Sequence, residues 1–245
     1  MDLMPPELPA LEAAASRPGL FLRRFTSAEA VAVATASLLR DALGGHTGEH
    51  RVIMLSGGRT PLTAYADLAA NPEHADPDAL TVFSDERVVP RNSPDNNFHQ
   101  ALPFLEAWGL VGDRAIAVHT ELPALQALEV FQHKLARLRA DDVAFPLALL
   151  GIGADGHTAG LFSREHLEQA AGRCAILVPR PDDLDGITAT PMVLSWFDRI
   201  VVLATGAAKR PRITEWFTGS ADVIASMATA SCPLVEIWAD PDAAP

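Results

Sequence analysis

The sequence has little cysteine and no excess of positive charge. Its 245 residues include only two cysteines, Cys174 and Cys232, and no Cys-x-x-Cys pair. This is typical of two reduced, buried thiols in a cytosolic protein rather than of a disulfide framework. The formal net charge is -12. Nucleic acids and anionic membranes are bound through basic patches, so we expect neither as a partner.

The chain also lacks a long hydrophobic run. Hydrophobic residues make up 49% of it, yet no apolar stretch approaches the roughly 18 residues of a membrane-spanning helix. The proline-rich N-terminus has no basic segment followed by an apolar core, which would mark a secretory signal. We therefore expect a cytoplasmic protein. Residues 1–19 are predicted to be a loosely ordered lead-in with a short helix at Leu8–Ser16, and residues 20–245 a single domain.

Strand and helix patterns alternate through residues 20–245. The first strand is expected at Leu20–Phe25, and Ser27 is expected to cap a helix over Ala28–Leu43. The pattern predicts a single doubly wound (Rossmann-like) α/β domain, with a mostly parallel sheet and helices on both faces. Further strands are expected at Arg51–Leu55, Leu80–Ser84, Ala115–Val118, Leu147–Leu150, Cys174–Val178, Arg199–Ala204 and Leu234–Trp238.

The stretch from Leu147 to Phe162 carries the most specific pattern in the chain. Its apolar strand runs into a turn with three glycines, of which Gly156 is the last. Glycine lets the backbone turn sharply and approach a ligand closely. Asp155 and His157 stand two residues apart in this turn. A carboxylate and an imidazole at the carboxyl end of a strand are candidate acid/base groups, and we expect a helix to begin just after them.

A second glycine turn follows the strand at Arg51–Leu55. The chain there reads Ser56-Gly57-Gly58-Arg59-Thr60-Pro61. We expect Thr60 to cap a helix that has Pro61 in its first position. Such a turn at a helix N-terminus offers backbone N–H groups to an anion. The alternative is an ordinary tight turn, and the flanking hydroxyls and the arginine favour the anion site.

Charged residues follow two further strands. Asp85-Glu86-Arg87 comes after the third strand, and a polar tract then leads to Asn97. A solvated salt-bridge cluster is the alternative interpretation, but the group lies at the same predicted sheet edge as the two glycine turns. Lys209 is expected in the first turn of a later helix, where a cation is disfavoured unless an anion accompanies it. A surface lysine is the alternative there.

Familiar cofactor and metal patterns do not fit. Gly-x-Gly-x-x-Gly at 151–156 matches the dinucleotide fingerprint, but Asp155 would face a pyrophosphate and no acidic residue ends the next strand. Neither a P-loop nor His-Glu-x-x-His occurs. His46 and His50 are four apart, but nearby glycines disfavour the helix that would align them on a metal. We expect no cofactor and no metal. The residues alone indicate acid/base chemistry on a small phosphorylated molecule, without fixing the reaction.

Three motifs together resemble the 6-phosphogluconolactonase family, within the larger group that includes glucosamine-6-phosphate deaminases. The similarity spans roughly residues 20–240. The three motifs are Ser56-Gly57-Gly58-x-Thr60-Pro61, Asp85-Glu86-Arg87-x-Val89-Pro90 with Asn97, and Gly151-x-Gly153-x-Asp155-Gly156-His157-Thr158-Ala159-x-Leu161-Phe162. Two shorter matches, Ile187-Thr188-x-Thr190 and Gly206-x-x-Lys209, follow in the expected order.

The resemblance implies hydrolysis of 6-phosphoglucono-δ-lactone to 6-phosphogluconate in the oxidative pentose phosphate pathway. It implies that His157 activates water as a general base and that Asp155 supports it, with backbone N–H groups of a glycine turn on the oxyanion. Arg87 and Lys209 are expected to hold the phosphate. We expect a monomer. The full set of implied substrate-binding residues is Ser56, Gly57, Gly58, Thr60, Asp85, Arg87, Asn97, Gly156 and Lys209.

Three departures from the family pattern stand out. Arg59 replaces a small polar residue, Ser163 replaces a proline, and Gly186 replaces an arginine that often precedes Ile-Thr. The last removes a possible cation. Two alternatives remain open: a glucosamine-6-phosphate deaminase or isomerase, which lacks support because no acid follows the turn before Glu165, and a non-catalytic sugar-phosphate-binding module.

Overall fold

A computed structural model describes residues 8–14, 16–45, 48–141, 143–219 and 222–245. An eight-stranded sheet runs through its centre in the order β1-β2-β11-β10-β7-β3-β4-β6. Every adjacent pair is parallel except β1 and β2. Its strands are β1 (Glu12–Ala13), β2 (Leu20–Arg24), β3 (Arg51–Leu55), β4 (Ala79–Phe83), β6 (Ala115–Ile116), β7 (Ala144–Gly151), β10 (Ile200–Ala204) and β11 (Val235–Ala239).

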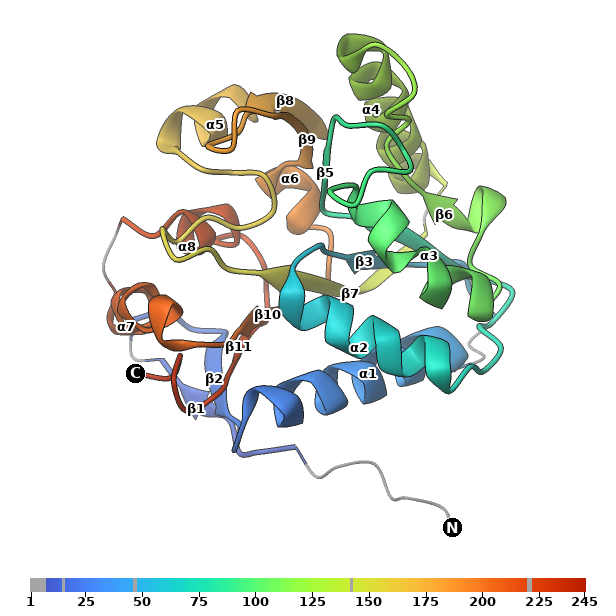
Figure 1. Ribbon diagram of the computed structural model, residues 1–245. Coiled ribbons are helices and arrows are strands. Elements are labelled where there is room, and N and C mark those ends of the chain that lie inside the picture. The colour runs from blue at the N-terminus through green and yellow to red at the C-terminus, as the bar shows by residue number, and fades with distance from the viewer. Residues whose placement is uncertain (1–7, 15, 46–47, 142, 220–221) are drawn as a thin grey trace.

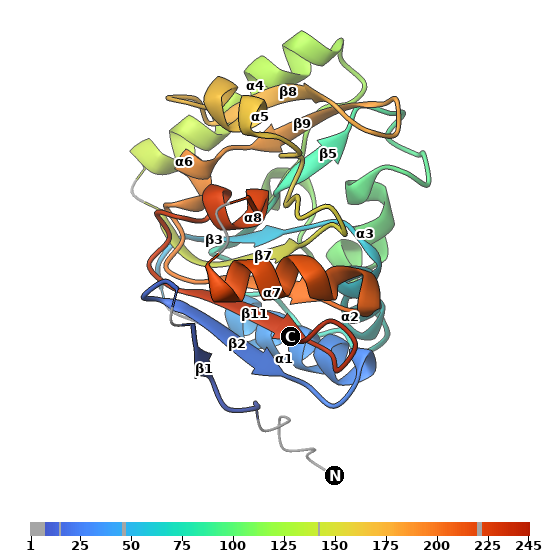
Figure 2. The same ribbon diagram turned by 90° about the vertical axis from the view of Figure 1, so that its left-hand side faces the viewer.

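Helices cover both faces of this large sheet, as predicted. The α-helices are α1 (Ala28–Gly44), α2 (Arg59–Ala70), α3 (Asn97–Ala107), α4 (Ala124–Ala140), α5 (Arg164–Gln169), α6 (Pro191–Leu194), α7 (Arg210–Thr218) and α8 (Ile224–Ala228). The short 3-10 helices are η1 (Gly112–Arg114) and η2 (Ala207–Lys209). Figures 1 and 2 show α1 and α2 on one side of the sheet and α4 on the other.

Two hydrophobic cores result from the alternation of side chains along the buried strands. In β3, Val52 and Met54 belong to the core beneath α4, α6 and α8. Ile53 and Leu55 belong to the core beneath α1, α2 and α3. A strand buried on both faces carries apolar side chains on both of them, which is why β3 appears in the sequence as a continuous apolar run from Val52 to Leu55.

A second, three-stranded antiparallel sheet was not predicted. It has the order β5-β9-β8, with β5 (Asp85–Arg87), β9 (Asp185–Ala189) and β8 (Ala175–Pro179). It lies with α4 and α5 above one face of the large sheet (Figure 2). The strand expected near residues 174–178 therefore exists but joins this small sheet. Strand β5 consists of three charged residues and β9 begins with Asp185 and Gly186, so neither shows a clear strand pattern in the sequence, and pairing between distant segments defines them.

Two helix predictions are wrong. The segment expected to be helical at Leu8–Ser16 contains β1, whose Glu12 pairs with Leu22 of β2. No helix begins after Gly156 either, because Ala159 has a left-handed backbone with φ of 50° and the turn is closed by a bridge between Thr158 and Leu161. The helix α5 starts only at Arg164, where the Ser163 hydroxyl accepts a hydrogen bond from the N–H of His166.

The two predicted helix caps have different outcomes. Ser27 caps α1 as predicted, accepting from the N–H of Ala30. Thr60 does not cap α2: Gly58 takes that position, and the Thr60 hydroxyl lies 2.7 Å from that of Thr205. His46 lies outside the described residues.

Candidate functional site

A cleft of about 300 Å³ opens where the carboxyl ends of the large-sheet strands meet the small sheet. One wall consists of the turns after β3 and β7 and of η2, and we call it the large-sheet wall. The other consists of β5, the residues that contact it and the loop after β8, and we call it the small-sheet wall. The lining residues are Ser56, Gly57, Gly58, Arg59, Asp85, Arg87, Asn97, Gly151, Ile152, Gly153, His157, Ala159, Arg180 and Lys209.

Asp155 and His157 form a hydrogen-bonded pair in the large-sheet wall. Asp155 Oδ1 lies 2.6 Å from His157 Nδ1, and the side chains are 54% and 30% exposed. The interaction with His157 lowers the pKa of Asp155 to about 2, against the opposing effect of burial. Asp155 is therefore ionised at neutral pH. Because Nδ1 contacts the carboxylate, Nε2 is the nitrogen that remains for a substrate or water.

Two glycines of this turn are required for different reasons: Gly153 because side chains approach its backbone closely, and Gly156 because its backbone has a positive φ. A Cβ on Gly153 would lie 2.1 Å from His157 Nδ1 and 2.2 Å from Asp155 Oδ1. Gly156 has φ of 90° and its N–H donates to the carbonyl of Gly153, whose own N–H donates to the carbonyl of His157. The turn thus uses these two amides internally and presents the Asp155 and His157 side chains.

Contacts from distant segments hold the same turn in place. The Thr158 hydroxyl donates to the carbonyl of Gly151 at 2.8 Å, and the N–H of Gly160 donates to the Thr188 hydroxyl in β9 at 3.0 Å. The N–H of Ala225 in α8 donates to the carbonyl of Gly156. Gly156 therefore shapes the turn, although it is not among the lining residues.

The turn after β3 brings a buried hydroxyl to the cleft. Ser56 is 3% exposed, and its Oγ has no hydrogen-bond partner among the residues described. Gly58 follows with φ of 108° and precedes α2. The first N–H groups of a helix have no partners within it, so they offer an anion site beside the Ser56 hydroxyl. Thr60 is not among the residues that line the cleft, and it lines two neighbouring hollows instead.

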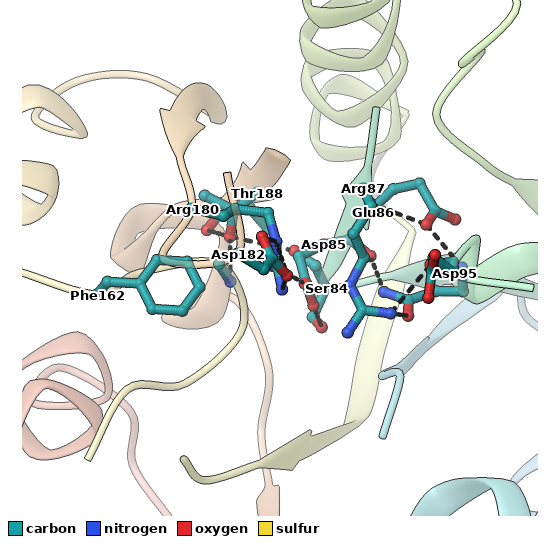
Figure 3. Close-up of polar contacts among 12 residues, drawn as sticks. Ser84, Asp85, Glu86, Arg87, Asp95, Phe162, Arg180, Asp182 and Thr188 are labelled. Atoms are coloured by element: carbon teal, nitrogen blue, oxygen red, sulfur yellow. Dashed lines mark hydrogen bonds and ion pairs between the residues drawn. The ribbon is translucent and has the colours of Figure 1, made fainter. Parts of the chain in front are cut away.

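Asp85, Arg87 and Asn97 meet in the small-sheet wall, as the sequence predicted. Arg87 Nη1 donates to Asn97 Oδ1 at 2.8 Å and to the carbonyl of Asp95 at 3.0 Å. Asn97 Nδ2 donates to the carbonyl of Asp85 at 2.8 Å. Arg87 Nε is buried and has no partner in the described part of the chain. Figure 3 shows Asp85 and Arg87, the first and last residues of β5, near each other.

Glu86 binds backbone N–H groups of the small-sheet wall and was not among the predicted site residues. Its carboxylate accepts hydrogen bonds from the N–H groups of Arg87, Asn97 and Phe98, at 2.9, 2.7 and 2.9 Å. Burial nevertheless raises the pKa of Glu86 to about 7. Its distance along the chain from α3, eleven residues before Asn97, left no local signal of this contact in the sequence.

Two further cations border the large-sheet wall. Lys209 ends η2, and burial lowers its pKa, with the positive charge of Arg59 acting in the same direction and the charge of Asp155 opposing. Arg59 is the first residue of α2 and also lines the cleft. Its positive charge stands where the family usually has a small polar residue. Arg180, in the loop after β8, also lines the cleft and was missed by sequence reasoning.

Within the described residues, no group of three or more His, Cys, Asp or Glu side chains is arranged to hold a metal ion. The same part of the chain contains no helix with the length and apolar character needed to cross a membrane.

A basic cleft at the carboxyl edge of a doubly wound sheet, with a hydrogen-bonded Asp–His pair, defines a class of α/β proteins suited to anionic small molecules. A family model described as glucosamine-6-phosphate isomerases/6-phosphogluconolactonase matches residues 24–235. The chain belongs to this family, and the resemblance inferred from its motifs is confirmed.

Individual relatives agree with the family match. The 6-phosphogluconolactonase of Treponema pallidum is 32% identical over 222 residues, covering 86% of each chain. That of Nostoc sp. is 33% identical over 180 residues, covering 71% of this chain and 74% of the relative. The match to that of Chlamydia pneumoniae, 29% identical, spans 64% of the relative's length.

Solved structures share the fold. The crystal structure of devB protein superposes with a TM-score of 0.81 at 25% identity, covering 91% of this chain and 98% of the other. A monomeric glucosamine-6-phosphate deaminase superposes with a TM-score of 0.72 at 18% identity, covering 91% and 98%. The latter likeness concerns the fold alone.

Proposed function

We propose that this protein is a 6-phosphogluconolactonase, which hydrolyses 6-phosphoglucono-δ-lactone to 6-phosphogluconate with His157 as the general base. The observation that carries the proposal is the 2.6 Å contact between Asp155 and His157 in a cleft whose walls also bear Arg59, Arg87 and Lys209. Family membership and the names of the relatives support the substrate.

In the proposed reaction, His157 Nε2 takes a proton from water as the water oxygen attacks the lactone carbonyl carbon. The ionised Asp155 stabilises the resulting imidazolium through Nδ1. When the ring C–O bond breaks, the imidazolium returns the proton to the departing ring oxygen. The products are a carboxylic acid, which ionises, and a hydroxyl group.

The charges around the cleft fit the substrate's anionic group. We assign its phosphate to Arg87 and Lys209, with help from the Ser56 hydroxyl and the N-terminus of α2. The buried Ser56 Oγ and Arg87 Nε support this assignment, because a buried polar atom without a partner is costly unless a ligand satisfies it.

The lactone can be generated in the assay by glucose-6-phosphate dehydrogenase, and the product measured with 6-phosphogluconate dehydrogenase. We expect the protein to accelerate the second NADPH phase well beyond the spontaneous rate. No acceleration, together with ammonia release from glucosamine 6-phosphate, would replace the proposal by a deaminase. Binding of 6-phosphogluconate without either activity would leave a binding module.

A further inference from the structure

Arg180 reaches the cleft from outside the predicted motifs. It follows β8, and its side chain is only 9% exposed. Asp182 accepts hydrogen bonds from Arg180 Nε and Nη2 at 3.1 and 3.0 Å, and Arg180 Nη1 faces Asp85 Oδ2 at 3.7 Å. Figure 3 shows Arg180 between Phe162 and Asp85. Asp182 thus holds the Nε and Nη2 atoms of the guanidinium, while Nη1 faces Asp85 at the cleft.

The register of the small sheet explains how this arginine fits. Gly186 of β9 lies directly opposite Arg87 of β5, so a side chain at position 186 would stand beside Arg87 on the same face. A Cβ on Gly186 would lie 2.9 Å from Arg180 Cδ and 3.2 Å from Arg180 Cγ. The stem of Arg180 therefore occupies the space that a side chain at position 186 would need.

An aromatic ring links Arg180 to the proposed base. The Arg180 guanidinium carbon lies 5.2 Å from the centroid of the Phe162 ring, within cation–π range. The Phe162 ring centroid in turn lies 4.5 Å from that of His157. Arg180 is therefore held in place by packing against an aromatic ring as well as by charge.

We infer that Arg180 is a substrate-binding residue, and that it supplies beside Arg87 the cation that Gly186 omits. The two guanidinium groups lie on either side of Asp85 and bind the phosphate of the sugar phosphate together. Arginine suits this role because its planar N–H groups match phosphate oxygens in pairs. The identity of the ligand rests on the proposed function, while the role of Arg180 as an anion-binding cation rests on the geometry.

The test measures both the Kd of 6-phosphogluconate, by calorimetry, and the kinetics of lactone hydrolysis. Arg180→Ala is expected to raise Kd and KM by about 10-fold or more, with kcat little changed. Gly186→Ala should act in the same direction, because its Cβ displaces the Arg180 stem. The double variant Arg180→Ala/Gly186→Arg should recover much of the lost affinity. Arg137→Ala, on an exposed arginine of α4, is the matched control.

The outcomes separate this inference from the proposed function. Lactone hydrolysis with Kd and KM unchanged in Arg180→Ala would overturn the role of Arg180 and leave the lactonase intact. Binding of 6-phosphogluconate that depends on Arg180, without hydrolysis, would uphold the role of Arg180 and reject the lactonase. If Arg180→Ala melts at a lower temperature, Gly186→Ala and the double variant decide the question. The inference is overturned if Gly186→Ala binds 6-phosphogluconate as tightly as the wild type and the double variant binds it no better than Arg180→Ala.

Discussion

The two walls of the cleft are built in different ways. In the large-sheet wall, Asp155 and His157 are neighbours in one turn and are oriented mainly by hydrogen bonds within it. In the small-sheet wall, Arg87 and Arg180 come from segments far apart in the chain, and antiparallel pairing brings them together. Under the proposed function, the acid/base pair therefore depends on a local turn, whereas the two arginines that we assign to the anionic group depend on pairing between distant segments.

The largest effect is expected from the large-sheet wall. His157→Ala removes the proposed base and should lower kcat by about 10²- to 10⁴-fold, with KM changed much less. The coupled hydrolysis assay measures both constants. His133→Ala, on an exposed histidine of α4, is the control. Near-normal turnover in His157→Ala would place the base elsewhere.

Arg87→Ala should instead affect substrate binding. The variant loses a partly buried guanidinium that Asn97 and Asp95 hold in place, so KM is expected to rise by roughly 10- to 100-fold while kcat stays within a few-fold. Initial rates over a wide lactone concentration range give the two constants. A fall in kcat as large as that of His157→Ala would remove the distinction between the walls.

Gly57→Ala tests the contact between the walls and should have a smaller effect. The new Cβ would lie 2.0 Å from Asn97 Oδ1, which accepts the hydrogen bond from Arg87. Asn97 must therefore shift, and we expect KM to rise by about 3- to 10-fold. Gly44→Ala, where a Cβ meets open space, is the matched control. An unchanged KM in Gly57→Ala would show that Asn97 does not position Arg87.

The smallest effect concerns stability and pH. Burial raises the pKa of Glu86 from an ordinary 4.5 to about 7, so the folded state binds more protons than the unfolded state between these values. Stability should therefore fall as pH rises from 4.5 to 7, by on the order of 2 to 3 kcal/mol. Thermal melts across this range should show a flatter dependence in Glu86→Gln. An equal slope in both proteins would contradict the raised pKa.

The sequence predicted the large sheet and its wall of the cleft well, for a physical reason. Central parallel strands are buried on both faces and appear as apolar runs, and glycine turns at their ends mark the ligand edge. This located Ser56 and His157 at the cleft and Asp155 beside His157, and the same reasoning placed Arg87 at the cleft from the end of a strand.

The small sheet could not be predicted in the same way. Strand β5 is the polar tripeptide Asp85–Arg87, and β9 begins in a loop-like segment, so neither has a recognisable period. Arg180 stands between prolines in the sequence and reaches the cleft only because Gly186 leaves space for its side chain. This packing between the loop after β8 and strand β9 cannot be predicted from the sequence of either segment alone.

The division between the walls is tested most directly by measuring 6-phosphogluconate binding and lactone turnover on the same two variants. We predict that His157→Ala binds 6-phosphogluconate with a Kd close to that of the wild type but hydrolyses the lactone about 10²-fold more slowly or worse. Arg87→Ala is predicted to bind weakly yet turn over at a near-normal rate at saturation. Equal losses of binding and turnover in both variants would contradict the account.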